Sequence, residues 1–285
     1  MSDTTPLLDI AELRIRFPTI DGGWSEAVRG VSLQLARHER LGIVGESGSG
    51  KSLTGRAVLG LLPRQAQWSA RRLAFAGQAL SALAPRQWRA LRGRHMAMIL
   101  QDPKYSLNPV LSVGQQLAEA FRQRDPGLSR RALRKQVLAA LAAVRIRDPQ
   151  RVAGAYPHEL SGGMGQRVMI AMMVASGPEL LIADEPTSAL DVTVQLQVLA
   201  ILDDLVRAQG TGLIFISHDL HLVASFCDRV LVMYAGRVLE ECAAGELHQA
   251  RHPYTRGLLA AAPDLERPQL ELPVLSRDAR WREDP

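Results

Sequence analysis

Residues 45 to 52 read Gly-Glu-Ser-Gly-Ser-Gly-Lys-Ser, and they follow the apolar run Leu-Gly-Ile-Val at residues 41 to 44. The apolar run predicts a buried strand, and the residues after the motif predict a helix from about Lys51 to Leu62, ending at Pro63. Glycines let the backbone curl until its N–H groups face inward, and a helix N-terminus adds about half a positive charge. The stretch therefore predicts a phosphate-binding loop between a strand and a helix.

The phosphate-loop motif predicts the roles of individual side chains. Lys51 is expected to reach the β- and γ-phosphates of a nucleotide, and the Ser52 hydroxyl is expected to bind Mg²⁺. The predicted nucleotide-binding residues of this segment are Gly45, Glu46, Ser47, Gly48, Ser49, Gly50, Lys51, Ser52 and Leu53. A chance glycine-rich turn with a surface lysine is the alternative, which the strand–loop–helix context disfavours.

Composition places the chain among soluble globular proteins. Its 285 residues can form one large or two small domains with a core. No apolar run reaches the ~18 residues of a membrane helix, and the N-terminus lacks the pattern of a signal peptide. We therefore expect a cytoplasmic protein. If it works at a membrane, something else must hold it there. Cys227 and Cys242 form no C-x-x-C motif and are expected to be reduced thiols.

The chain has a net positive charge and two clusters of arginines. The net charge is +5, and arginines gather over residues 86–94 and again over residues 130–135. Such clusters can bind nucleic acid or an anionic membrane surface, or they can be solvated helix faces. Only one aromatic residue that could stack on a base, Trp88, lies within the two clusters. Solvated faces are therefore favoured, and no nucleic-acid partner is expected.

A second apolar run ends in acidic residues. Residues 180 to 187 read Leu-Leu-Ile-Ala-Asp-Glu-Pro-Thr, which predicts a buried strand with carboxylates at its C-terminal end. Parallel sheets bind ligands at that edge. Asp184 is expected to bind Mg²⁺, directly or through water, and Glu185 to polarise the water that attacks the γ-phosphorus. A solvated acidic turn is the alternative, and the phosphate loop makes it less favourable.

Two further predicted strands end in polar residues. His218 follows the run 213–216 and can hydrogen-bond a γ-phosphate or the attacking water. Gln101 follows the run 98–100, and its amide can contact both Mg²⁺ and the attacking water. A structural histidine and a polar loop residue are the respective alternatives.

A second anion-binding turn precedes an apolar helix. Residues 160 to 167 read Leu-Ser-Gly-Gly-Met-Gly-Gln-Arg, so the N-terminus of that helix can bind phosphate. One triphosphate does not need two such turns in one protein, whereas two copies arranged head to tail can complete each other's sites. Together with the preceding motifs, this resembles the ATP-binding cassette (ABC) family.

The resemblance implies an α/β fold: an ABC-type P-loop NTPase with a parallel-sheet RecA-like core, an N-terminal antiparallel β piece and a helical subdomain. It implies that the signature residues Ser161, Gly162 and Gly163 contact ATP held by a second cassette. Asp191 matches the loop that lines the seam between the cassettes, together with Ser188, Ala189 and Leu190. Gln101 matches the Q-loop glutamine and His218 the switch histidine of that family.

Several segments resemble the cassettes of bacterial dipeptide, oligopeptide and nickel importers. They are Leu53-Thr54 after the phosphate loop, the runs 106–109 and 156–159, and His252-Pro253-Tyr254-Thr255 with the residues up to Pro263. The resemblance implies an ATP-hydrolysing subunit at the cytoplasmic face of the inner membrane. Its implied partners are two permeases, a second cassette and, indirectly, a substrate-binding protein. The second cassette is expected to be a different chain, with a copy of this chain as the alternative. A nickel or nickel-chelate importer is the alternative, and a soluble ABC ATPase acting on DNA or ribosomes is a weaker one.

The expected layout is a nucleotide-binding domain over residues 1–245, with a helical subdomain at about 102–176, and a C-terminal extension over 246–285. Helices are expected at 115–122 and 129–144. A further helix is expected to bury Val192, Leu196, Leu199, Leu202 and Val206. The segment 105–113 is expected to receive a short helix from a permease.

Some positions depart from the pattern of the family or leave a role open. The adenine ring is expected to stack on Trp24, in a polar turn, with Phe17 as the alternative. His38 stands where many relatives have glycine, and Gly165, inside the signature helix, should cost about 1 kcal/mol relative to alanine. The chain has no cysteine after Cys242, so no iron–sulfur cluster is expected in the extension.

Overall fold

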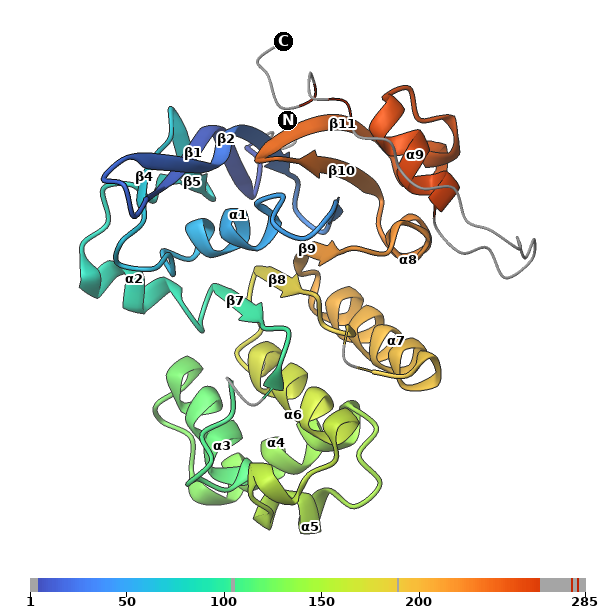
Figure 1. The fold of residues 1–285 in the computed structure, drawn as a ribbon. Coiled ribbons are helices and arrows are strands. Elements are labelled where there is room, and N and C mark those ends of the chain that lie inside the picture. Colours follow the sequence, from blue (N-terminus) through green and yellow to red (C-terminus); the bar gives the residue numbers. More distant parts are fainter. Residues whose placement is uncertain (1–4, 104–105, 189, 262–277, 279–280, 282–285) are drawn as a thin grey trace. The chain divides into compact units, whose positions relative to one another are not determined.

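The computed structural model describes residues 5–103, 106–188, 190–261, 278 and 281. The chain forms two compact units, residues 1–83 with 214–285 and residues 84–213 (Figure 1). Tyr105, Ala189, Pro263 and most of the predicted extension after residue 261 lie outside the described residues. The predicted subdomain limits at about 102–176 stay a prediction, because the second unit also contains strands.

An antiparallel sheet opens the first unit. β1 (Leu8–Pro18) pairs with β2 (Trp24–Leu35), and alternate side chains of β1, including Leu13 and Ile15, are buried. The strands run in the order β2-β1-β5-β6, and β4 also pairs with β1. The remaining strands of this sheet are β4 (Gln67–Ser69), β5 (Arg72–Phe75) and β6 (Gln78–Ala79). The predicted N-terminal antiparallel piece is confirmed.

The first unit also holds the strand that leads into the phosphate loop. β3 (Arg40–Val44) is parallel to β10 (Arg229–Tyr234), which forms an antiparallel hairpin with β11 (Arg237–Ala243). β9 (Gly212–Ser217) lies on the other side of β3. The helical segments of this unit are α1 (Lys51–Val58), α8 (Leu220–Phe226), the 3₁₀ turn Ala244–Gln249 and α9 (Pro253–Ala261).

Helix α1 is shorter than the sequence pattern predicts. It ends at Val58 instead of Leu62, because Gly60 adopts a left-handed conformation with φ of +60°. The Gly60 N–H bonds the Ala57 carbonyl, and the Leu61 N–H bonds the Arg56 carbonyl. This is the Schellman arrangement that terminates many helices at a glycine.

The second unit is mostly helical and carries two parallel strands, β7 (Met96–Ile99) and β8 (Leu180–Asp184). Its helices are α2 (Pro85–Leu91), α3 (Val113–Arg124), α4 (Arg130–Ala143), α5 (Pro149–Gly154), α6 (Gly162–Val174) and α7 (Val192–Gln209). The predicted helices at 115–122 and 129–144 are confirmed, and the buried face of α4 contains Leu133, Val137 and Leu141. No helix in the described part of the chain is long and apolar enough to span a bilayer.

The prediction for the buried face of α7 is partly wrong. Leu199, Leu202 and Val206 are buried, but Val192 and Leu196 are 69% and 61% exposed. The apolar stripe runs along the whole helix, but other side chains of the unit cover only its later part. Val192 and Leu196, in the first two turns of α7, are left exposed. A periodic pattern identifies the apolar stripe but not the surface that covers it.

His38 is one of six non-glycine residues with positive φ in the described chain, at +64°. The left-handed conformation explains why glycine suits this position better. The departure at His38 therefore concerns the turn before β3.

Candidate nucleotide site

The predicted phosphate loop runs from β3 into α1 with three glycines in conformations that other residues avoid. Gly45, Gly48 and Gly50 have φ of +148°, +81° and +96°. A Cβ on Gly45 would lie 2.0 Å from the Met233 carbonyl oxygen, and one on Gly50 would lie 2.8 Å from the Ala27 carbonyl oxygen. The first and last of these glycines are therefore required both by conformation and by close backbone contact.

Lys51 is turned back onto this loop. Its side chain is buried (5% exposed), and Nζ donates to the carbonyl oxygens of Gly45 at 2.7 Å and Glu46 at 2.9 Å. The N-terminus of α1 has no acidic residue in its first turn, and Gly50 provides no side-chain cap. A buried ammonium beside uncapped helical N–H groups suits a polyphosphate anion, so these residues fit the predicted ligand.

A cavity of about 510 Å³ lies along the outer part of the loop. Its lining residues are Ser25, Glu26, Ala27, Arg29, Glu46, Ser47, Gly48, Ser49, Tyr234 and Ala235. Trp24 and Phe17 do not line it, although Ser25, the register partner of Phe17, does. Trp24 is 45% exposed, and the Arg16 guanidinium lies 4.7 Å from the centre of its ring. Adenine stacking on Trp24 stays a prediction.

In the second unit, polar side chains meet where β7 and β8 end. Asp184 is buried at the end of β8 (4% exposed), and Gln101 follows β7. The Gln101 amide Nε2 donates to the Glu185 carboxylate at 3.2 Å. The predicted Q-loop glutamine and the predicted general base are therefore in direct contact.

Glu185 has φ of +47°, a strained conformation for a residue with a side chain. Its carbonyl oxygen accepts hydrogen bonds from the Ser188 N–H at 3.3 Å and from the Ser188 hydroxyl at 3.2 Å. The next carbonyl, that of Pro186, accepts from the side chain of Gln166. These bonds hold the backbone on the C-terminal side of the strained residue, directly after the end of β8.

Gln166 is a residue that the predicted site omits. It lies in α6 with 2% of its surface exposed, and it contacts the backbone next to Glu185. A single amide within an apolar helix is the sequence signal that could identify it, because a buried amide needs partners.

The predicted signature loop forms the N-terminus of α6. The Ser161 hydroxyl accepts a hydrogen bond from the Met164 N–H at 3.3 Å, and the first turn contains no acidic residue. Ser161 and Gly162 are exposed. Asp191 is also exposed and caps α7, where its carboxylate accepts from the Val194 N–H at 3.0 Å. These residues lie on the surface of the second unit, as a role toward a second molecule requires.

We expect Gly165→Ala to raise the free energy of unfolding by about 0.5–1 kcal/mol, because helical glycine is that much less favourable than alanine. A Cβ at Gly165 would meet Pro103 at 3.5 Å, an ordinary van der Waals contact. At Gly163 the Cβ would lie 3.0 Å from Val194 Cγ1, so Gly163→Ala is the matched variant expected to gain less. Urea unfolding measures both, and equal gains would contradict the prediction.

His218 lies at the C-terminal end of β9, exposed, between Ser217 and Asp219. The Ser217 hydroxyl accepts the Asp219 N–H at 3.0 Å, and Asp219 caps α8. The phosphate loop and His218 belong to the first unit, whereas the carboxylates and the signature loop belong to the second. Their joint action on one nucleotide is therefore a proposal.

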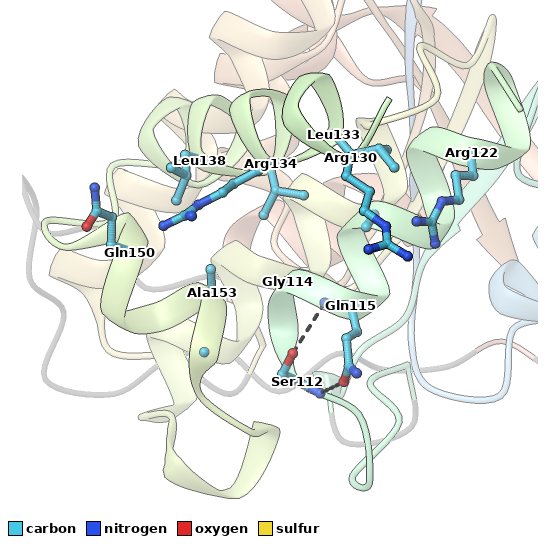
Figure 2. A pocket seen from close by; sticks show the side chains of 13 residues that line it. Ser112, Gly114, Gln115, Arg122, Arg130, Leu133, Arg134, Leu138, Gln150 and Ala153 are labelled. Atoms are coloured by element: carbon cyan, nitrogen blue, oxygen red, sulfur yellow. Dashed lines mark hydrogen bonds between the residues drawn. The ribbon is translucent and has the colours of Figure 1, made fainter. Parts of the chain in front are cut away.

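The second arginine cluster lines a groove in the second unit. A cavity of about 460 Å³ lies among α3, α4 and α5. Figure 2 shows Arg130 and Arg134 extending from α4, Arg130 on the side of Gln115 and Arg134 on the side of Gln150. No described residue forms an ion pair with Arg130 or Arg134, and no carboxylate lines the cavity. The groove begins at Ser112, within the segment predicted to contact a permease.

Comparison with known proteins agrees with this geometry. The family model for the ABC transporter matches residues 28–188. The probable peptide ABC transporter ATP-binding protein y4tR of Sinorhizobium fredii is 48% identical over 263 residues, which cover 92% of this chain and 78% of that protein. The oligopeptide transport ATP-binding protein OppD of Bacillus subtilis is 46% identical, with coverage of 93% and 74%. The probable D,D-dipeptide transport ATP-binding protein DdpD of Escherichia coli is 46% identical, with coverage of 95% and 83%.

Solved structures confirm the predicted α/β P-loop fold. The cbiO1 subunit from Clostridium perfringens, part of an ABC transporter complex, has a TM-score of 0.71 at 27% identity, covering 89% of this chain and 95% of that chain. A dimeric ATP-binding cassette bound to ADP and phosphate has a TM-score of 0.73 at 23% identity, covering 83% and 98%. The chain belongs to the ABC transporter family, as one of its ATP-binding and ATP-hydrolysing cassettes.

Proposed function

We propose that this cassette is the ATP-hydrolysing subunit of a bacterial importer of dipeptides or oligopeptides. The observation that carries the proposal is the 45–48% identity, over 92–95% of the chain, to proteins named for peptide, oligopeptide and D,D-dipeptide transport. The cassette would act at the cytoplasmic face of the inner membrane, attached to two permease subunits and served by a substrate-binding protein.

Within the proposed site, each residue has a separate task. Lys51 and the loop N–H groups would hold the phosphates. Ser52, Asp184 and Gln101 would hold Mg²⁺, which would neutralise charge on the phosphates. Glu185 accepts the proton of the attacking water. His218 is proposed to hydrogen-bond the γ-phosphate.

A second cassette is proposed to complete the site. Ser161, Gly162 and Gly163 would face the nucleotide of the partner, with Asp191 at the seam. The N-terminus of α6 is exposed and has no acidic residue in its first turn. This supports the role, since such a helix N-terminus can bind an anion. The exposed apolar pair Val192 and Leu196 beside Asp191 supports a covering partner as well. The partner is either a different chain, which we favour, or a copy.

The surface around residues 105–113 is proposed to receive a short helix from a permease. Tyr105 lies outside the described residues, but Val110 is 75% exposed. The arginine-lined groove that begins at Ser112 supports contact with a segment that carries acidic side chains, since opposite charges favour docking.

The transported substrate can be tested by measuring uptake in wild-type cells and in cells that lack the gene and are complemented with it or with a variant. Radioactive di- and oligopeptides should enter wild-type cells and cells complemented with the wild-type gene, but not cells complemented with Lys51→Ala. Loss of nickel uptake with normal peptide uptake would replace the proposal with the nickel alternative. Normal uptake of both, with the protein recovered on ribosomes or DNA, would favour a soluble ATPase.

We expect Leu196→Asp to reduce ATP-dependent association of cassettes by at least about tenfold, because a carboxylate would be buried in an apolar seam. Size-exclusion chromatography with light scattering measures the association, with the co-purified second cassette and with the chain alone. Val110→Asp is the matched control, an exposed apolar residue outside the proposed seam. Unchanged association of Leu196→Asp would remove this residue from the seam.

A further inference from the structure

The segment that begins with His252-Pro253-Tyr254-Thr255 supports the phosphate loop from outside, within the first unit. Tyr254 lies in the first turn of α9, and its surface is completely buried (0% exposed). Its hydroxyl accepts a hydrogen bond from the backbone N–H of Glu46 at 3.2 Å, across 208 positions of sequence. The C-terminal segment therefore contacts the second residue of the loop directly.

The position of Tyr254 is fixed by its surroundings. Its ring centre lies 4.6 Å from that of Tyr234 and 5.8 Å from that of Trp281. Its backbone N–H donates to His252 Nδ1 at 3.1 Å. Burial lowers the pKa of His252, against the opposing charge of Glu240, and a neutral ring keeps Nδ1 able to accept this bond. The tyrosine is thus held by its ring and by its backbone.

The turn before Tyr254 is anchored to β11. The Glu240 carboxylate accepts the backbone N–H groups of Arg251 and His252, the latter at 3.3 Å. Burial raises the pKa of Glu240, but hydrogen bonds, including those from these two N–H groups, outweigh it and lower the pKa. The carboxylate therefore stays ionised and holds the turn. A continuous set of bonds connects β11 to the phosphate loop through the C-terminal segment.

The hairpin of β10 and β11 also contacts the loop. The Gly236 N–H donates to the Ser49 carbonyl oxygen at 3.1 Å, and Gly45 lies against the Met233 carbonyl. A backbone N–H that is shielded from water needs a hydrogen-bond acceptor. For the Glu46 N–H, that acceptor is the Tyr254 hydroxyl.

We propose that Tyr254 is a positioning residue of the nucleotide site, which sets the backbone of the phosphate loop from the C-terminal segment. The inference rests on the proposed role of that loop in holding the phosphates of ATP. Because coupling between two sites is reciprocal, nucleotide binding in turn reduces local opening of residues 253–261.

The test removes only the hydroxyl. Tyr254→Phe keeps the ring in its aromatic cluster and should raise the dissociation constants of Mg·ATP and Mg·ADP by about 3- to 10-fold, the usual contribution of one neutral hydrogen bond. The turnover rate at saturating ATP should change less than about twofold, because the reacting groups are untouched. Tyr156→Phe is the matched control, since it removes a phenolic hydroxyl from the other unit.

Amide hydrogen exchange supplies a readout that a purely structural role would not give. Mg·ADP should slow exchange in residues 253–261 of the wild type and have a smaller effect in Tyr254→Phe. Should Tyr254→Phe unfold, His252→Ala, which removes the acceptor of the Tyr254 N–H, should weaken nucleotide binding in the same direction.

If the wild type binds ATP and Tyr254→Phe keeps the wild-type nucleotide affinity, this inference is overturned and the proposed function is not. The same holds for His252→Ala where it replaces Tyr254→Phe. Exchange in residues 253–261 that does not respond to Mg·ADP in the wild type also overturns it. A wild-type protein that binds no ATP overturns the proposed function together with the inference.

Discussion

Glu185→Gln is expected to bind ATP as tightly as the wild type and to hydrolyse it roughly 10²–10⁴-fold more slowly, the usual contribution of a general base. The substitution keeps the shape of the side chain, and the amide oxygen can still accept from Gln101, which now bonds the carboxylate at 3.2 Å. What is lost is the ability to take a proton from water. Single-turnover hydrolysis and a nucleotide titration measure the two quantities separately.

The matched control for this prediction is Asp204→Asn, an exposed carboxylate of the same unit that pairs with Arg145. It makes the same charge change on the surface and should leave the turnover rate within about twofold, since exposed ion pairs contribute little. Normal hydrolysis by Glu185→Gln would mean that another group activates the water. Loss of ATP binding would mean that the substitution disturbs the strained backbone at φ of +47° and not the proton transfer.

The parts of the site that could be predicted from the sequence are those whose chemistry is local. The phosphate loop needs particular glycines between a strand and a helix, and Asp184 and Glu185 directly follow an apolar run, so spacing alone identifies them. The contact between Gln101 and Glu185 follows from the parallel pairing of β7 and β8, which brings the ends of the two strands together.

The parts that could not be predicted depend on contacts between distant segments. Nothing in the sequence shows that the Tyr254 hydroxyl contacts Glu46, because the motif around Tyr254 carries no chemistry of its own. Periodicity also cannot show where an apolar stripe stops being covered, which explains the error at Val192 and Leu196. The early end of α1 is different: Gly60 is a recognised helix-termination signal, and the sequence contained it.

Lys51→Ala should weaken binding of Mg·ATP and Mg·ADP by about 10- to 150-fold, since hydrogen bonds to charged groups contribute about 1.5–3 kcal/mol. The ammonium is buried beside uncapped helical N–H groups, so its charge acts at short range. A titration with a fluorescent nucleotide measures the affinity. Arg56→Ala, which removes a positive charge from the last turn of the same helix, is the control and should change the affinity less than about twofold.

The same substitution should also lower the stability of the nucleotide-free protein. Lys51 Nζ donates to the carbonyl oxygens of Gly45 and Glu46, so alanine removes one donor from each of them. The Glu46 carbonyl still accepts from the Ser49 N–H at 3.2 Å, so the loss falls mainly on the Gly45 carbonyl. The expected loss is about 1–3 kcal/mol in the free energy of unfolding, the cost of unsatisfied buried polar groups. Comparing affinity with stability distinguishes two roles: a variant that loses stability but keeps wild-type affinity would show that Lys51 holds the loop and does not bind phosphate.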